Sequence, residues 1–89
     1  MRDVHLSSVD LNLLPALEAL LRRRNVSAAA ADVGLSQPAM SRALARLRET
    51  TGDPLLVRAG RGLVPTPRAV ELRERVSQVV EEGQAVLRP

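Results

Sequence analysis

The sequence predicts a small, mainly α-helical domain in which three short helices are followed by a two-stranded β-hairpin and a long last helix. Three observations support this prediction. Apolar residues recur every three or four positions in separate stretches. Capping residues stand at the expected helix starts, and two short apolar segments flank a glycine-containing turn. With 89 residues the chain has room for one modest core, so a large active-site cleft is not expected.

The first helix is predicted within residues 10–25, which read DLNLLPALEALLRRRN. Its apolar face consists of Leu13, Leu17, Leu20 and Leu21. Asp10 is the expected N-cap. Because Pro15 lacks a backbone N–H, the helix could start near residue 11 or be restarted at residue 14, and the sequence leaves both open.

Two further helices are predicted on either side of a tight turn. Asn25 can cap the second helix, and Gly34 can end it by adopting the left-handed conformation. Ser36 can cap the third helix, where Pro38 is tolerated in the first turn. Two helices joined by about three or four residues with a glycine in the joint have the helix-turn-helix geometry. The inner face of the third helix is expected to consist of Met40, Ala43, Leu44 and Leu47.

The outer face of the third helix is polar at its start, which packing alone does not require. The line opposite the apolar face consists of Gln37, Ser41, Ala45 and Arg48, with Pro38 and Arg42 beside it. Glutamine can bond adenine, arginine can bond guanine, and a proline ring can touch a thymine methyl group. The second helix of a helix-turn-helix meets base edges with its start, so we predict contact with double-stranded DNA. The alternative is that these residues are only solvated.

A hairpin is predicted after the third helix, where LLVR and LVP flank AGRG. Arg58 and Arg61 lie at or near its tip, which is where a wing touches the DNA backbone or the minor groove. Leu55, Val57 and Leu63 are expected to face the core. Hairpins with exposed arginine also occur in proteins that do not bind DNA, but this one directly follows a helix-turn-helix.

Thr66 is expected to cap the last helix, with Pro67 in the first position and free N–H groups where an anion could sit. Apolar residues then follow alternating steps of four and three, which is typical of a helix that pairs with another helix. This pattern predicts a homodimer, and the alternative is a stripe that packs on its own domain. The predicted dimer interface consists of Ala69, Leu72, Val76, Val79 and Val86.

The basic residues are unusual in type and in placement. All thirteen are arginine, in a chain of net charge +3, and arginine suits bidentate contacts to phosphate and guanine. Residues 36–68 contain six arginines and two acids, whereas residues 71–82 contain four glutamates and two arginines. A GC-rich genome would explain the missing lysine but not this placement. The two segments are therefore expected to have different partners.

Several classes of function lack the groups that they need. His5 is the only histidine and there is no cysteine, so neither an enzyme nor a metal or other cofactor is expected. RNA and single-stranded DNA are commonly bound by aromatic side chains, of which the chain has none. No apolar run approaches the roughly 20 residues that span a bilayer, so we expect a cytoplasmic chain without a membrane partner. The remaining alternative is a winged-helix module that binds proteins and dimerises.

Taken together, the segments DLNLLPALEALL, SAAAADVGLSQPAMSRALARLRE and GDPLLVRAGRGLVPTPRA resemble the N-terminal DNA-binding domain of the LysR-type transcriptional regulators, in particular the NodD-like branch. The resemblance covers about residues 9–87. It implies a winged helix-turn-helix in residues 1–65 and a linker or dimerisation helix in residues 66–89. It also implies a pseudo-palindromic DNA site, a homodimer or a full-length tetramer, and a larger effector-binding domain that this chain lacks. Met1 is then the expected native start, and the chain is expected to be truncated after the linker helix.

The resemblance also implies roles for individual residues. Base or groove contact is expected for Gln37, Pro38, Ser41 and Arg42, and contact with the DNA backbone for Ser27, Ser36, Arg61 and Thr66. Arg58 of the hairpin, which is predicted to touch the DNA backbone or the minor groove, is also a candidate DNA-binding residue. Ala28 and Ala45 stand where many relatives have a basic residue, so some phosphate contacts are expected to be lost. Leu14 and Leu56 replace aromatic residues, which is expected to affect the core more than the DNA interface.

Overall fold

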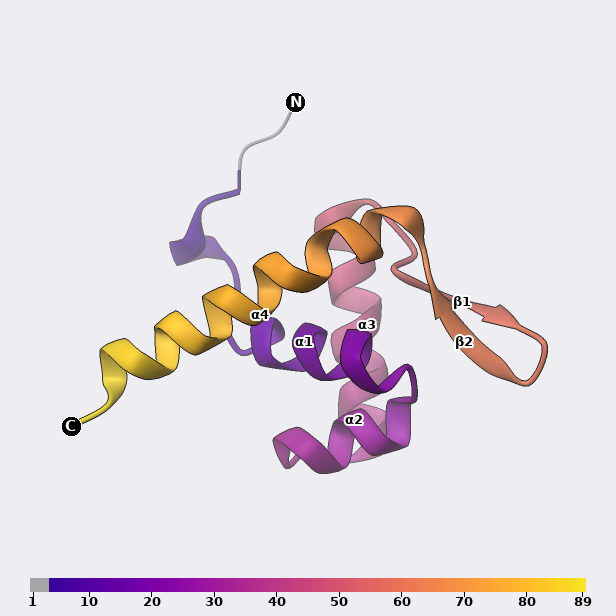
Figure 1. The fold of residues 1–89 in the computed structure, drawn as a ribbon, viewed down its shortest axis with the longest axis horizontal. Helices are drawn as coiled ribbons and strands as arrows, with labels where there is room; N and C mark the ends of the chain where they lie inside the picture. Colours follow the sequence, from indigo (N-terminus) through magenta and orange to yellow (C-terminus); the bar gives the residue numbers. More distant parts are fainter. Residues whose placement is uncertain (1–3) are drawn as a thin grey trace.

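The computed structural model describes residues 4–89, so the expected start at Met1 lies outside the described residues. Its elements are a short 3-10 turn η1 (Leu6–Ser8), α1 (Leu13–Arg23), α2 (Val26–Val33), α3 (Gln37–Thr51), β1 (Leu56–Ala59), β2 (Gly62–Pro65) and α4 (Pro67–Leu87). This confirms the predicted class of three helices, a hairpin and a long last helix. In Figure 1 the hairpin projects from one side of the helical body, and the end of α4 projects from the other. No helix within residues 4–89 is long and apolar enough to cross a membrane.

Side-chain caps begin three of the helices as predicted. The Asn25 side chain accepts a hydrogen bond from the Ala28 N–H at 2.8 Å, and Ser36 Oγ accepts one from the Ala39 N–H at 3.2 Å. Thr66 Oγ1 likewise caps α4. These bonds satisfy N–H groups that have no partner inside the helix.

The start of α1 differs from the prediction. Asn12 occupies the N-cap position without a side-chain cap, and Asp10 Oδ1 accepts a hydrogen bond from the Asn12 N–H at 2.9 Å. Asp10 therefore stabilises the turn that precedes the helix. The helix begins at Leu13, so Pro15 falls in its first turn, where a missing N–H leaves no intrahelical bond unmade.

A glycine turn joins α2 to α3. Gly34 has a φ of 71°, and the Leu35 N–H donates a hydrogen bond to the Ala30 carbonyl at 2.9 Å. This six-to-one bond across a left-handed glycine ends α2 and reverses the chain. α3 then begins at Gln37, which confirms the predicted helix-turn-helix joint.

The core is centred on α1, which contacts α2, α3 and α4. The predicted apolar face of α1 is buried, as are Met40, Leu44 and Leu47 of α3, while Ala43 is half-buried. The largest fully buried side chains are Leu20, Leu21, Met40, Leu55 and Leu56. Burying one such side chain contributes about 1.5–3 kcal/mol, so leucine and methionine supply what aromatic residues supply in other cores.

The base of the hairpin departs from simple strand alternation. Leu55 is buried and Leu63 is half-buried as predicted, but the side chain of Val57 is 39% exposed, so its assignment to the core was wrong. Leu56 is buried in its place. The reason is the left-handed backbone of Leu55, with a φ of 64°, directly before β1. Alternation begins only at the strand, which allows two consecutive leucines to enter the core.

The first half of α4 packs against α1 of the same chain. Ala69 and Val76 are buried, and Leu72 and Val80 are half-buried. The prediction that Ala69 and Val76 form a dimer interface is therefore corrected, because their side chains are already covered within one chain. The side chain of Leu72 is also partly covered within one chain.

Candidate nucleic-acid interface

The start of α3 presents polar side chains that the fold does not use. Gln37 and Pro38 occupy the first two helical positions, and all of Gln37, Pro38, Ser41 and Arg42 are exposed. Met40 and Leu44 of the same helix are buried. Within residues 4–89, no side-chain hydrogen bond or ion pair involves Gln37, Ser41 or Arg42. Their donors and acceptors are therefore free to bond an external ligand.

Two serines lie at the starts of α2 and α3. Ser36 Oγ accepts the cap bond from Ala39, so its hydroxyl proton can still be donated outward. Ser27 is exposed in the first turn of α2. Both hydroxyls are placed beside helix starts, where N–H groups and the helix dipole favour an anion.

Thr66 has a role within the fold besides its predicted contact with the DNA backbone. Its hydroxyl donates a hydrogen bond to Asp53 Oδ2 at 2.7 Å and accepts one from the Ala69 N–H at 3.1 Å. A hydroxyl has a single proton, and here Asp53 takes it. Contact of Thr66 with the DNA backbone stays a prediction, and in this structure the proton of its half-buried hydroxyl goes to Asp53.

Arg48 and Asp53 fasten the hairpin to the helices, a role that the sequence did not reveal. Arg48 Nε donates a hydrogen bond to the Pro54 carbonyl and Nη2 donates one to the Leu56 carbonyl, both at 2.8 Å. Asp53 Oδ2 accepts a hydrogen bond from the Leu55 N–H at 2.8 Å as well as the bond from Thr66. The Arg48 side chain therefore turns to the hairpin base. The one available signal was aspartate before proline, which is typical of a turn.

The electrostatics of this junction favour an ionised carboxylate. The hydrogen bond from Thr66 and the bond from the Leu55 N–H lower the pKa of Asp53, and the positive charge of Arg68 adds to the effect. Both bonds go to the charged form of the side chain and so stabilise it. At neutral pH Asp53 is therefore a charged acceptor that links the end of α3 to the start of α4.

The hairpin carries two arginines close to its tip. Gly60 and Arg61 form the turn, and Gly60 has a φ of 61°, which is the glycine position of a two-residue hairpin turn. Arg58 lies opposite Leu63 in the strand register. Arg58 and Arg61 are both exposed, and neither forms an ion pair within the described residues 4–89.

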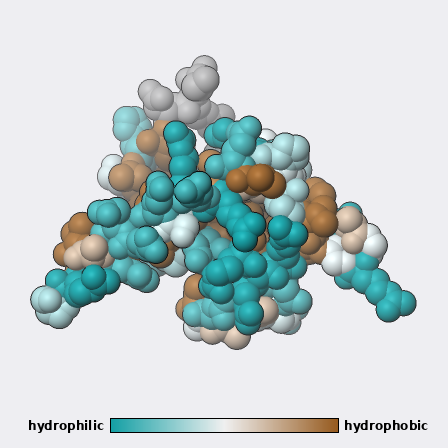
Figure 2. Space-filling model, viewed as in Figure 1, coloured by the Kyte–Doolittle hydropathy of each residue, from teal (hydrophilic) through white to brown (hydrophobic). Residues whose placement is uncertain are grey.

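Other arginines are neutralised inside the domain. Arg22 and Arg23 each lie 3.0 Å from Asp32, and Arg22 also lies 3.2 Å from Glu18. The Glu18 hydrogen bond and charge raise the pKa of Arg22 above its usual value. The pairs with Asp32 tie α1 to α2, whereas Arg42 of α3 and Arg58 and Arg61 of the hairpin have no ion pair within residues 4–89. Hydrophilic residues cover most of the face seen in Figure 2.

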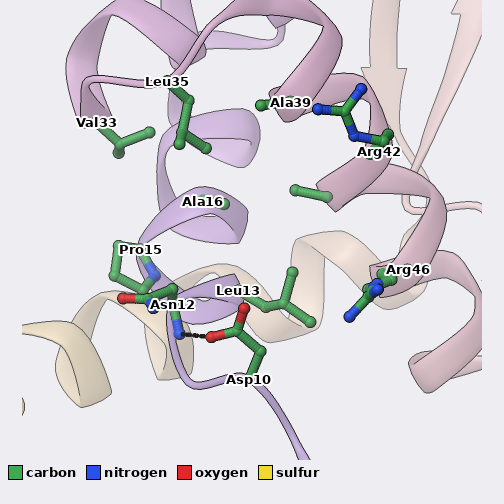
Figure 3. A pocket seen from close by; sticks show the side chains of 11 residues that line it. Asp10, Asn12, Leu13, Pro15, Ala16, Val33, Leu35, Ala39, Arg42 and Arg46 are labelled. Carbon is green, nitrogen blue, oxygen red and sulfur yellow. Dashed lines mark hydrogen bonds between the residues drawn. The ribbon is translucent and has the colours of Figure 1, made fainter.

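An open cleft of about 700 Å³ lies between the start of α1, the helix-turn-helix joint and α3. In Figure 3, Arg42 and Arg46 extend from α3 on one side, and Asp10 and Asn12 lie across from them. Asp10 is the one carboxylate that lines the cleft, and its Oδ1 already accepts a hydrogen bond from Asn12. The lining lacks the paired acid and base that proton-transfer catalysis uses.

Comparison with curated proteins identifies close relatives. The chain is 59% identical over 79 residues to the HTH-type transcriptional regulator SyrM 2 of Sinorhizobium fredii, which covers 89% of this chain and 23% of that protein. It is 57% identical over 68 residues to Nodulation protein D 2 of the same species, which covers 76% of this chain and 22% of that protein. The chain therefore spans less than a quarter of the length of these relatives.

Solved structures share the fold. The probable transcriptional regulator PA0477 from Pseudomonas aeruginosa superimposes with a TM-score of 0.80 at 41% identity, over 94% of this chain and 29% of that one. Vibrio fischeri DarR in complex with DNA superimposes with a TM-score of 0.77 at 28% identity, over 89% of this chain and 27% of that one.

A family model described as "Bacterial regulatory helix-turn-helix protein, lysR family" matches residues 11–70, which run from the turn before α1 to the first turn of α4. This range contains the helix-turn-helix, the hairpin and the exposed polar residues of α2, α3 and the hairpin described above. The resemblance in the sequence is thereby confirmed, and the chain belongs to the LysR family of bacterial regulatory helix-turn-helix proteins.

Proposed function

We propose that this chain binds double-stranded DNA sequence-specifically, as the DNA-binding part of a LysR-type transcriptional regulator that acts in the bacterial cytoplasm. α3 enters the major groove, and the hairpin lies on the backbone or in the minor groove. The observation that carries this proposal is the exposed, unpaired polar start of α3, a helix whose Met40, Leu44 and Leu47 are buried in the core. The DNA-bound relative of similar fold supports it.

The proposed contacts divide into two classes. Gln37 and Arg42 read base edges, because their side chains can form paired hydrogen bonds to adenine and guanine. Ser27, Ser36, Arg58 and Arg61 hold the DNA backbone. Phosphate contacts supply much of the affinity and fix the register, whereas base contacts supply the choice of sequence.

A homodimer completes the proposal. The second half of α4 leaves the domain surface, and its side chains Val79 and Val86 are 49% and 78% exposed. Figure 2 shows apolar surface at the far end of this helix, on the left. Pairing of these ends would cover that surface and place two copies of α3 on the half-sites of a pseudo-palindromic DNA. In a full-length protein two such dimers could form a tetramer.

The test uses duplexes selected from a random library by the wild-type chain. Arg42→Ala is expected to weaken binding to the selected site by about 1–3 kcal/mol, roughly 5- to 150-fold, and to relax the choice at one base pair. Arg73→Ala is the matched control, because Arg73 is exposed on α4 and unpaired within residues 4–89. Equal losses by Arg42→Ala on every sequence would make Arg42 a phosphate contact. Absence of salt-dependent binding by the wild-type chain would favour a protein-interaction module.

A further inference from the structure

The end of α1 carries an arginine in a backbone conformation that suits glycine. Arg24 has a φ of 53° at the C-cap of α1, whereas the corresponding caps of α2 and α3 are Gly34 and Gly52, with φ values of 71° and 68°. Side chains disfavour this left-handed region. Residues held in it often lie at functional sites. The Arg24 side chain is therefore expected to have a use that outweighs the strain.

Helix stability does not explain Arg24. A cation at a helix C-terminus is favourable, but Arg22 and Arg23 already lie in the last turn of α1. Both of these side chains reach Asp32 at 3.0 Å, while no ion pair within residues 4–89 involves Arg24. Arg24 is exposed, and it takes no part in the ion pairs that join α1 to α2.

The surroundings of Arg24 suit an anion. A cleft of about 140 Å³ between the α1–α2 turn and the hairpin is lined by Arg24, Asn25, Val26, Arg58 and Arg61, together with residues 62 and 63. No carboxylate lines it. Val26 is the first residue of α2, so the positive end of that helix dipole also borders the cleft. Three guanidinium groups near one another repel unless an anion lies between them.

We propose that Arg24, Arg58 and Arg61 form a phosphate-binding site that takes a phosphodiester of the DNA backbone between the α1–α2 turn and the hairpin. The site rests on the proposed DNA binding and adds Arg24 to it. Guanidinium groups bond phosphate oxygens in pairs. One phosphate held from both sides fixes the position of the hairpin relative to the helix-turn-helix.

The experiment compares Arg24→Gly, Arg24→Lys and the control Arg73→Ala in salt titrations on a selected and a scrambled duplex. Glycine relieves the left-handed strain, so a loss of binding by Arg24→Gly would not reflect unfolding, and the urea midpoint checks this. We expect Arg24→Gly to weaken binding equally on both duplexes and to lower the slope of log affinity against log salt, by less than the roughly 0.9 of a whole phosphate contact because Arg58 and Arg61 still face the same phosphate. Its deficit therefore shrinks as the salt concentration rises from 50 to 200 mM. Arg24→Lys and Arg73→Ala are expected to keep the wild-type slope.

Two results would overturn the phosphate site while leaving DNA binding intact. One is a wild-type slope and affinity for Arg24→Gly, and the other is a loss confined to the selected duplex, which would indicate a base contact. A wild-type chain that binds neither duplex would instead contradict the proposed function itself. The two failures are therefore distinguishable.

Discussion

At the scale of single residues, Asp53 makes stability depend on pH. Its pKa is lowered in the folded chain by the Thr66 and Leu55 hydrogen bonds. In acid the unfolded chain therefore binds more protons than the folded chain, and stability falls as the pH falls through the folded pKa of Asp53. The contribution is fully present above the ordinary value of 3.8.

The corresponding prediction concerns Asp53→Asn, which keeps an oxygen acceptor but removes the charge. We expect this variant to have a lower urea midpoint than the wild-type chain at pH 7, and the difference to shrink as the pH falls below the ordinary carboxyl value of 3.8. Urea unfolding, monitored by circular dichroism at each pH, measures the midpoints of the variant and of the wild-type chain. A difference that stays constant as the carboxylate is protonated would show that its charge is unimportant.

Single residues also show what the sequence could predict. The caps Asn25 and Ser36 were predictable, because capping depends on a hydrogen bond to an N–H three residues further on. The orientation of Arg48 was not, because its partners are carbonyls whose position depends on the path of the hairpin. The burial of Leu56 was not predicted, because nothing in the local sequence pattern indicates the left-handed backbone of Leu55.

At the scale of elements, two bonds from Arg48 attach the hairpin to α3. Arg48→Met is expected to loosen the hairpin and to lower the free energy of unfolding by about 1 kcal/mol, since part of the bonding is exposed to water. Arg48→Lys is expected to behave like Arg48→Met, because lysine cannot span two carbonyls with a fork. Faster amide exchange in residues 56–65 is the measurement. Full protection in Arg48→Lys would show that charge alone suffices.

The second element-scale prediction concerns the exposed half of α4. Val79→Glu together with Val86→Glu is expected to convert a dimer into a monomer, because charges would replace its apolar surface. Sedimentation equilibrium gives the mass. Val70→Glu is the control, because Val70 is 58% exposed on the opposite side of α4. A double variant with the wild-type mass would contradict pairing through α4.

The helices themselves were largely predictable, but the partner of α4 was not. Alternating steps of three and four identify an apolar face without saying what covers it. The structure divides that face, because Ala69 and Val76 pack on α1 while Val79 and Val86 stay exposed. The proposed domain division at residue 66 is likewise a matter of sequence pattern, since the first half of α4 completes the core.

At the scale of the whole molecule, some arginines are paired with acidic side chains and others are not. Acidic side chains pair Arg22 and Arg23 between α1 and α2, whereas Arg24, Arg42, Arg58 and Arg61 have no ion pair within residues 4–89. With a net charge of +3, the chain therefore exposes unpaired positive charge at α3, the α1–α2 turn and the hairpin. Such charge attracts a polyanion at long range.

The most direct test of this account measures wild-type binding to a selected duplex and to its scrambled counterpart over a range of salt concentrations. Fluorescence anisotropy reports the binding. Affinity for both is predicted to fall linearly with the logarithm of salt concentration, because phosphate contacts release counterions. At physiological salt the selected duplex should bind about 10³-fold more tightly or better. Equal affinity for both duplexes, or binding insensitive to salt, would contradict the claim that the start of α3 reads bases in duplex DNA.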